Sequence, residues 1–388
     1  MKTYDGGTLS GTTITGTPVA EQDWGLDALG NWGTYTQKAS GSATLNQTRT
    51  HNKANEISAI SIASGGTGTD WIDPTYDLAG NRVTGPYPLS PSLSLTMTYD
   101  AWNRLVRVQL NGTFQIFAAE YDGLGRRIVR TDEGMTRRSY YNESWQELEV
   151  RKEASAGVED TDPMEQFVWH PYYIDALATR FYDANVSGSQ TQHYFTHDAN
   201  FNVTAALDTT GNVVERYDYS PYGEPIFLDA NFDFDADSAS DIAPYRMYTG
   251  QRLDTETGLY QYRNRYYHAR LGRFISRDPI GYEGSDTKNL YEYVDSKPLD
   301  SLDPTGNDVL GDIVTGGGAA ILTDICTPEP TDLLPHKWGA YAVGAVVIGG
   351  TYVGYQAYCY CRSKKSNDDD EVKGGEKGDR RRGGYFKR

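Results

Sequence analysis

The segment SLSLTMTYDAWNRLVRVQL, residues 92–110, contains the pattern that decides the fold. Every second residue before Tyr99 is apolar, which is typical of a strand with one buried face. Residues 100–104 then favour a turn, because Asp can accept hydrogen bonds from its own backbone and Asn tolerates positive φ. A second strand-like run, Leu105–Leu110, follows. The segment therefore predicts a β-hairpin.

This hairpin belongs to a repeated unit of the form Tyr-Asp-x-x-Gly-Asn/Arg. Successive copies begin 22 to 25 residues apart, a spacing that indicates a repeat architecture. One hairpin is marginal in water, whereas stacked hairpins pair with each other's exposed edges. We therefore predict a mainly β strip of hairpins over residues 1–145. Its clear copies are YDLAGNRV from Tyr76, YDAWNRLV from Tyr99 and YDGLGRRI from Tyr121, and its weaker copies are YDGGTL from Tyr4, LDALGNW from Leu26 and HNKANEI from His51.

The composition agrees with a β-rich protein and narrows the classes of partner. The 41 Gly and 30 Tyr residues favour tight turns and strands over helices. The formal net charge is -17, although the chain from Arg362 onward holds 10 basic and 6 acidic residues. The remaining body is therefore strongly acidic and would repel a phosphate backbone, so we expect no nucleic-acid partner.

The repeats resemble those of the RHS/YD-repeat proteins, and later segments extend the resemblance. YYNESWQELEV from Tyr140, QFVWHPYYIDALATR from Gln166 and VVERYDYSPYGEPIF from Val213 resemble the stretch that leads into the RHS-associated core. We place this shell continuation at residues 146–247, and residues 248–306 resemble the core itself. The resemblance implies a β-sheet strip that spirals into a hollow shell, which in several relatives encloses a toxic C-terminal segment.

Two Asp-Pro-x-Gly elements begin at Asp278 and Asp303. Pro fixes φ, Gly takes positive φ and Asp caps the backbone, so each element predicts a tight turn. Two carboxyls held close together could instead share a proton and act as acid and base. RHS relatives carry such a pair as a self-cleaving aspartyl protease. Carried over by position, Asp278 and Asp303 would be the dyad, Arg277 the adjacent cation, and Gly306–Asn307 the region of the cut.

The sequence differs from the self-cleaving relatives at two points. The spacer between the two elements, Tyr282–Leu302, has 21 residues and is longer than usual in the family. Asn307 stands where self-cleaving members usually have Leu or Met. We therefore expect the core to close the β shell, with self-cleavage as the alternative.

The acidic loop at residues 229–243 has a spacing that resembles a calcium loop. Counted from Asp233, aspartates occupy the first, third, fifth and ninth positions. Ser238 and Pro244 stand where such a loop needs Gly and Glu, so we expect a solvated loop without metal. The six histidines are scattered along the chain, and we expect no metal site and no small-molecule cofactor.

After the core, the composition changes twice. Residues 307–337 form a connector rich in Gly and Pro, and residues 338–361 contain no charged side chain over 24 positions. As a helix this run would span about 36 Å, which exceeds the roughly 30 Å of a bilayer core. A buried Gly-rich hairpin is the alternative. We predict one C-terminal transmembrane helix at 338–361, followed by a charged, disordered tail at 362–388.

The flanks of this run set the expected topology. Aromatic residues stand at both ends, a G-x-x-x-G motif lies within the run, and basic residues follow it directly. These features place the C-terminus in the cytoplasm and the body outside. The predicted anchor residues are Trp338, Gly350, Gly354, Arg362, Lys364 and Lys365.

Three functions follow from the sequence. The first is a membrane-tethered RHS-repeat scaffold at the cell surface, whose partners would be membrane lipid and a surface glycan or protein. The second is a self-cleaving polymorphic toxin that releases its C-terminal segment. The third is a carbohydrate-binding surface protein, because exposed Tyr and Trp suit stacking on sugars. The N-terminus shows no secretory signal, so we expect this chain to be the C-terminal portion of a longer bacterial protein.

Overall fold

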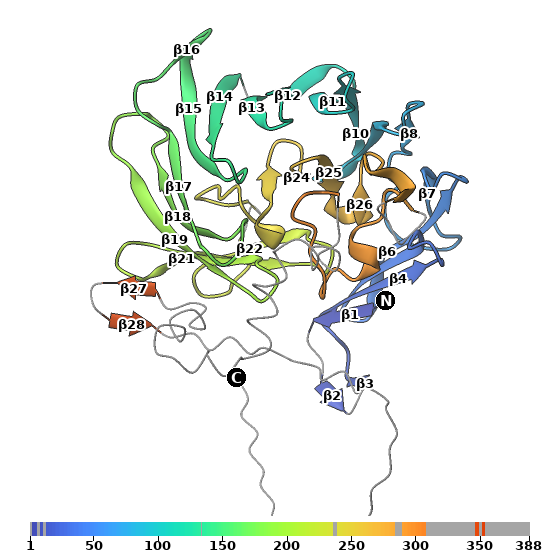
Figure 1. Ribbon diagram of the computed structural model, residues 1–388. Helices are drawn as coiled ribbons and strands as arrows, with labels where there is room; N and C mark the ends of the chain where they lie inside the picture. The colour runs from blue at the N-terminus through green and yellow to red at the C-terminus, as the bar shows by residue number, and fades with distance from the viewer. Residues whose placement is uncertain are drawn as a thin grey trace, which may run out of the picture. The chain divides into compact units, whose positions relative to one another are not determined.

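The computed structural model describes residues 2–5, 8–10, 13–132, 134–235, 239–283, 289–307, 346–348 and 351–353. All of them lie in one compact unit, residues 1–357. This unit is built almost wholly from antiparallel strands (Figure 1), which confirms the prediction of a mainly β fold.

The largest sheet has 15 strands, and consecutive strands of the chain pair side by side along it, apart from one two-residue strand that lies off this path. Hairpin follows hairpin in the order of the sequence, as stacked repeats require. The predicted hairpin at 92–110 is confirmed, since Met97 pairs with Val108. The strands are β8 (Thr75–Tyr76), β9 (Arg82–Tyr87), β10 (Ser90–Tyr99), β11 (Leu105–Leu110), β12 (Phe114–Tyr121), β13 (Arg127–Asp132), β14 (Met135–Tyr141), β15 (Glu147–Ser155), β16 (Val158–Glu159), β17 (Glu165–Trp169), β18 (Leu177–Tyr182), β19 (Thr191–His197), β20 (Val203–Leu207), β21 (Val213–Tyr219) and β22 (Pro225–Leu228).

A five-stranded sheet precedes it in the chain, in the order β1-β4-β5-β6-β7. The last edge of this sheet is capped by side chains: Asp73 accepts the Ile60 N–H at 2.7 Å and Asp70 accepts the Ile62 N–H at 3.1 Å. These bonds occupy donors that an open edge would expose. The strands are β1 (Lys2–Asp5), β4 (Ala20–Leu26), β5 (Trp32–Ala39), β6 (Ser42–His51) and β7 (Ile57–Ile62), and a separate hairpin is formed by β2 (Thr8–Ser10) and β3 (Thr13–Thr15).

The turn of each repeat is closed by its first side chain. In the turn at 122–126, Asp122 Oδ1 accepts the N–H of Leu124 and of Arg126, both at 2.9 Å. Gly125, in the fourth position, has φ +86°, which explains the Gly or Asn of the motif. The same pair of bonds is made by Asp27, Asn52, Asp100, Asn142, Asp198, Asp208 and Asp229.

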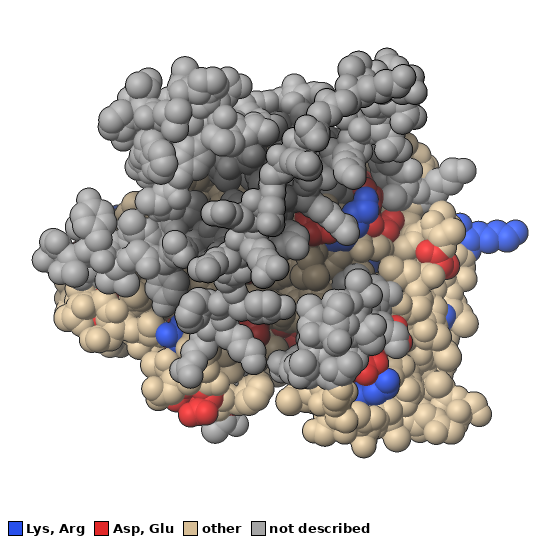
Figure 2. All heavy atoms as spheres, turned by 90° about the horizontal axis from the view of Figure 1, so that it is seen from below, with Lys and Arg blue, Asp and Glu red and all other residues tan. Residues whose placement is uncertain are grey.

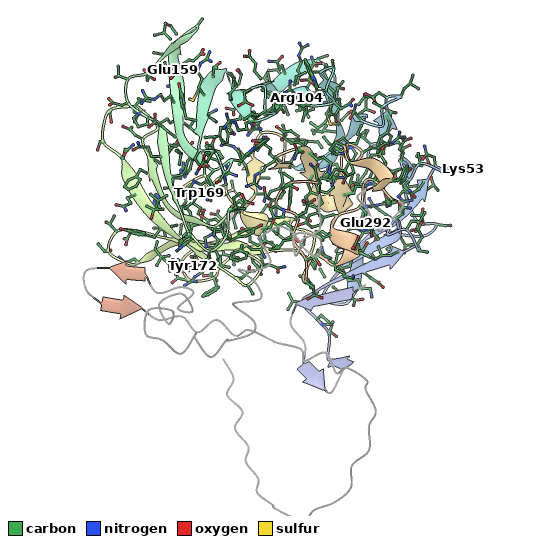
Figure 3. All side chains as sticks on the ribbon, viewed as in Figure 1. Lys53, Arg104, Glu159, Trp169, Tyr172 and Glu292 are labelled. Carbon is green, nitrogen blue, oxygen red and sulfur yellow. The ribbon has the colours of Figure 1, made fainter. Side chains whose placement is uncertain are left out.

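The tyrosines of four repeats reach back to the preceding repeat. Each of these hydroxyls donates to the carbonyl of the first residue after the previous turn, whereas the Tyr76 hydroxyl accepts the N–H of Ile57 at 3.4 Å. Trp169, labelled in Figure 3, takes the place of a tyrosine and donates from Nε1 to the Glu147 carbonyl at 2.8 Å. The tyrosine bonds are Tyr99 to Arg82 at 3.0 Å, Tyr121 to Leu105 at 2.7 Å, Tyr141 to Arg127 at 2.8 Å and Tyr219 to Val203 at 2.8 Å.

Removal of one such hydroxyl should weaken the protein measurably. Tyr141→Phe leaves the Arg127 carbonyl without its donor, and we expect the free energy of unfolding to fall by about 1 kcal/mol. Urea denaturation followed by tryptophan fluorescence would measure the change. Tyr282→Phe is the matched control, because Tyr282 is 63% exposed. Equal stability of the two variants would show that the inter-repeat bond contributes nothing.

A small four-stranded sheet packs against the long sheet (Figure 1). The hydroxyl of Tyr260 donates to the Gly223 carbonyl at 2.9 Å, and that of Tyr267 donates to the Tyr222 carbonyl at 2.9 Å. Both rings are fully buried, so the sheet brings an aromatic core into contact with the repeats. Its strands are β23 (Arg252–Asp254), β24 (Leu259–Tyr262), β25 (Arg265–His268) and β26 (Arg273–Phe274), and single 3-10 turns lie at η1 (Tyr248–Gly250), η2 (Ala269–Leu271), η3 (Gly281–Glu283) and η4 (Val294–Ser296).

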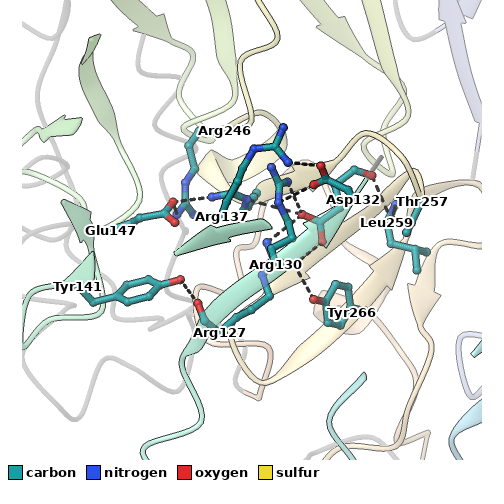
Figure 4. A network of polar contacts seen from close by, with 12 residues as sticks. Arg127, Arg130, Asp132, Arg137, Tyr141, Glu147, Arg246, Thr257, Leu259 and Tyr266 are labelled. Atoms are coloured by element: carbon teal, nitrogen blue, oxygen red, sulfur yellow. Dashed lines mark hydrogen bonds and ion pairs between the residues drawn. The ribbon is translucent and has the colours of Figure 1, made fainter. Parts of the chain in front are cut away.

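Buried ion pairs join the small sheet to strands β13 to β15 (Figure 4). Arg127 contacts Asp254 with both terminal nitrogens, at 2.5 and 2.9 Å. Arg252 of the small sheet contacts Glu147 at 2.6 Å, and Arg246 reaches the same carboxylate at 3.2 Å. Burial alone would raise the pKa of the Glu147 carboxyl, but the two guanidinium groups lower it to about 2. Charge pairing therefore fixes the small sheet in place.

Figure 2 shows one face of the molecule, with the described acidic and basic residues coloured. Acidic and basic side chains lie interspersed among other residues there. The acidic loop predicted at 229–243 begins with one more repeat turn, in which Asp229 accepts the N–H of Asp233 at 2.9 Å. Residues 236–238 of this loop lie outside the described part.

The structure does not support the predicted transmembrane helix. Of residues 338–361, six are described, and they form the antiparallel pair β27 (Val346–Ile348) and β28 (Thr351–Val353). Four of those six residues are β-branched valine or isoleucine, which suit strands. Within the described ranges no helix is long and apolar enough to cross a membrane.

The expected roles of the anchor residues stay predictions. These residues lie outside the part that the structure describes: Trp338, Gly350, Gly354, Arg362, Lys364 and Lys365.

Candidate functional site

The second Asp-Pro-x-Gly element lies against the turn that joins β24 to β25. Three successive residues of this turn hold three successive carbonyls of the element. Arg263 donates to the Pro304 carbonyl. Asn264 donates to the Thr305 carbonyl from its backbone N–H at 3.2 Å and from Nδ2 at 3.1 Å. Arg265 donates from Nε to the Gly306 carbonyl. We call residues 303–307 the clamped segment.

Asp303 forms the turn that the sequence predicts. Its Oδ1 accepts the N–H of Gly306 at 2.7 Å and that of Asn307 at 3.2 Å. Gly306 has φ +76°, and a Cβ at this position would lie 2.3 Å from the Tyr262 carbonyl oxygen. Gly is therefore required both by the backbone conformation and by the close approach of the two chain segments.

Asp278 forms an equivalent turn. Its Oδ1 accepts the Ile280 N–H at 2.9 Å, and its carbonyl accepts the N–H of Gly281 at 3.1 Å. The Asp278 N–H donates to the Leu290 carbonyl at 2.9 Å, so this turn is attached to a residue within the spacer. Both elements are thus turns, as the simpler interpretation of the sequence expects.

The structure also brings the two carboxylates together, around one guanidinium group. Arg265 NH2 lies 2.9 Å from Asp278 Oδ2 and 3.6 Å from Asp303 Oδ2. The exposed fractions of the three side chains are 4% for Arg265, 10% for Asp278 and 3% for Asp303. Water therefore screens these charges little, and their mutual interactions are strong.

The cation beside the pair is Arg265, whereas Arg277 points elsewhere. The guanidinium of Arg277 contacts Glu56 at 2.6 Å, and its side chain packs over Gly80 in a repeat turn. Tyr291 also donates to Glu56, at 3.2 Å. Arg277 therefore attaches the core to the repeats, and the structure places it away from the role that sequence position alone suggested.

Sequence reasoning missed Arg265 because its role depends on a contact between distant segments. The only local signal is the run Arg263-Asn264-Arg265, in which three long polar side chains occupy a hairpin turn. Such a turn does not need three hydrogen-bond donors for its own closure.

A small cavity adjoins this hairpin turn. Its volume is about 40 Å³, and its walls include Asn264, Arg265 and Ser276. A site needs roughly 10–15 Å³ to admit one water molecule, so this cavity has room for water next to Arg265. No group of three or more His, Cys, Asp or Glu side chains within the described ranges could hold a metal ion.

The comparison with protein families finds one match to this part of the chain. The Teneurin YD-shell model matches residues 95–299. This range includes most of the long sheet, the whole of the small sheet and the turn at Asp278, and it ends before Asp303.

Two bacterial relatives illustrate the similarity to individual proteins. The chain is 29% identical over 296 residues to the tRNA nuclease WapA of Bacillus subtilis, which is 74% of this chain and 11% of the relative. It is 28% identical over 251 residues to the double-stranded DNA deaminase toxin A of Burkholderia cenocepacia, which is 60% of this chain and 16% of the relative. The chain thus spans only a small part of these relatives' length.

Among solved structures, the crystal structure of TcdB2-TccC3-TEV matches with a TM-score of 0.43 and 18% sequence identity. The match covers 75% of this chain and 17% of the solved chain.

Proposed function

This chain belongs to the Teneurin YD-shell family of RHS/YD-repeat proteins, and we propose that it is the self-cleaving end of a toxin-type shell. In this proposal the repeats and the small sheet hold the clamped segment, and the chain is cut between Gly306 and Asn307. Residues 307–388 are then released. The similarity to a tRNA nuclease and to a DNA deaminase toxin supports a toxin, while the activity of the released segment of this chain is left to experiment.

One observation carries the proposal: the guanidinium that donates to the Gly306 carbonyl also contacts two buried carboxylates. Asp303 Oδ1 is 3.2 Å from the Asn307 nitrogen, which is the leaving group of the cleavage. Asp278 contacts the same guanidinium nitrogen as Asp303 does. A carboxylate pair of this kind can supply one base and one acid at the same pH.

The proposed reaction is hydrolysis. Asp278 takes a proton from water as the water oxygen attacks the Gly306 carbonyl carbon. Protonated Asp303 gives its proton to the Asn307 nitrogen as the C–N bond breaks. The products are a Gly306 carboxyl group and an Asn307 amine, and no other reactant is required.

Tags at both ends of the chain test the proposal. We expect immunoblots of the wild-type protein to show two fragments, the smaller of which carries the C-terminal tag. Asp278→Asn and Asp303→Asn should each leave one full-length band, because each removes one member of the pair. Asp300→Asn is the control, since Asp300 is exposed and belongs to neither element. A single band from the wild type, or cleavage in both Asn variants, would overturn the proposal.

A membrane-tethered scaffold is a second candidate, and the uncharged run at 338–361 favours it. In that case the chain stays whole, the body lies outside the cell and the C-terminus lies in the cytoplasm. Fractionation of cells that express the doubly tagged Asp303→Asn chain would test the tether, because cleavage cannot separate the two ends. Recovery of both tags from the soluble fraction would argue against it.

A further inference from the structure

We propose that Arg265 is a catalytic residue of this cleavage, which polarises the Gly306 carbonyl while it holds both carboxylates. The inference rests on the proposed function and adds to it a residue and a role. Its basis is geometric, since one guanidinium donates to the carbonyl oxygen of the bond to be cut and contacts both members of the acid pair.

The guanidinium is fixed before any reaction takes place. Its plane lies over the Phe274 ring, with Cζ 3.6 Å from the ring centroid. NH1 donates to the Leu290 carbonyl at 3.1 Å, and NH2 faces the two carboxylates. Nε is thereby directed at the Gly306 oxygen. Because these contacts already hold the planar fork, it needs no reorientation when the reaction begins.

Such a donor acts most strongly where negative charge develops. When water adds to the Gly306 carbon, the carbonyl π electrons move to the oxygen, which becomes an oxyanion that the Nε–H stabilises. The electron pair returns as the C–N bond breaks, and Asn307 leaves with the proton from Asp303. Because the guanidinium is almost wholly buried, its interaction with the oxyanion is little screened.

Arg263 makes different contacts from Arg265, so the two residues allow positioning of the clamped segment to be distinguished from catalysis. It donates to the carbonyl of Pro304, two peptide bonds before the cut, and pairs with Asp175 at 2.6 Å. It can therefore orient the clamped segment, but it does not touch the reacting carbonyl. Arg265 is the residue of this turn that reaches both the reacting oxygen and the two carboxylates.

Pulse-chase synthesis of the full chain in a cell-free system would test the role. We expect Arg265→Gln to slow cleavage by at least about 100-fold, as is typical when an oxyanion donor is removed. Arg263→Gln should slow it by less than about 10-fold, as expected from weaker positioning alone. Arg270→Gln should cleave like the wild type, because Arg270 pairs with Glu224 outside the clamped segment. Wild-type cleavage by Arg265→Gln would overturn the inference.

Two further measurements separate misfolding from lost catalysis. Resistance to limited proteolysis shows whether the Arg265→Gln variant is folded. If that variant does not fold, the cleavage rate of Arg265→Lys tests the role of Arg265 instead. Lys keeps the charge, but its single nitrogen cannot reach the oxygen and both carboxylates as the fork does, so we expect at least a roughly 10-fold slower cut. A wild-type rate in Arg265→Lys would overturn the inference. If the wild-type chain is not cleaved, the proposed function is rejected. That result differs from wild-type cleavage by an Arg265 variant, which rejects only the role of Arg265.

Discussion

Arg127→Met should reduce the free energy of unfolding by about 3 kcal/mol, the largest loss of stability that we expect from one substitution here. Arg127 is 3% exposed and contacts Asp254, whose side chain is fully buried. Removal of the guanidinium leaves a buried carboxylate with weaker contacts, from Arg130 at 3.4 Å and Arg252 at 3.6 Å. These contacts place the expected loss at the lower end of the usual range for a broken buried pair.

Urea denaturation of the full chain would measure this loss. Arg107→Met is the matched control, because Arg107 is exposed on β11 of the same sheet. We expect the control to change the free energy of unfolding by less than about 0.5 kcal/mol. Equal values for the two variants would show that the small sheet does not depend on its buried charges.

Gly306→Ala should reduce the rate of self-cleavage by about 100-fold, because a shift of about 1 Å at a reacting group can cost that much. The added Cβ would lie 2.3 Å from the Tyr262 carbonyl oxygen, so the clamped segment must move away from Arg265. The same shift would weaken the bonds that Asp303 makes to the two N–H groups of the turn.

Gly281→Ala separates this clash from backbone strain. Gly281 has φ +71° and Gly306 has φ +76°, so both substitutions carry a similar penalty of roughly 1 kcal/mol. A Cβ at Gly281 meets no heavy atom within 4 Å. Pulse-chase synthesis should therefore show cleavage close to the wild-type rate for Gly281→Ala and strongly delayed cleavage for Gly306→Ala. Similar rates in the two variants would contradict the role of the clamp.

Much of the fold could be predicted from local sequence, because the repeat encodes its own turn. An Asp followed three residues later by Gly or Asn closes on its own backbone, and a strand on each side follows from alternation. The turns at Asn142, Asp198 and Asp208 make the same bonds with less regular spacing, so their sequences did not stand out as repeats.

The inter-repeat bonds could not be predicted in the same way. The tyrosine hydroxyl of one unit finds its acceptor in the previous unit, as Tyr121 does at the Leu105 carbonyl. The period of the sequence identifies the repeat but does not say which atoms join neighbouring copies.

The candidate site was predictable only in its two aspartates. Both follow from the Asp-Pro-x-Gly pattern, whereas the shared cation depends on a contact between segments about 40 positions apart, Arg265 and Gly306. Sequence position suggested Arg277, which instead reaches Glu56 more than 200 positions away. Within the run for which the sequence predicts a transmembrane helix, the structure describes residues 346–348 and 351–353 as a pair of antiparallel strands, and their β-branched residues suit that conformation.

Intact-mass spectrometry of the purified 388-residue chain tests the central claim most directly. The account predicts two masses in place of 43.1 kDa: one for residues 1–306, ending in a free Gly306 carboxylate, and one for a fragment that begins with Asn307. Asp303→Asn should give the single full-length mass. A wild-type protein of full-length mass, or fragments that meet at a different peptide bond, would contradict the account.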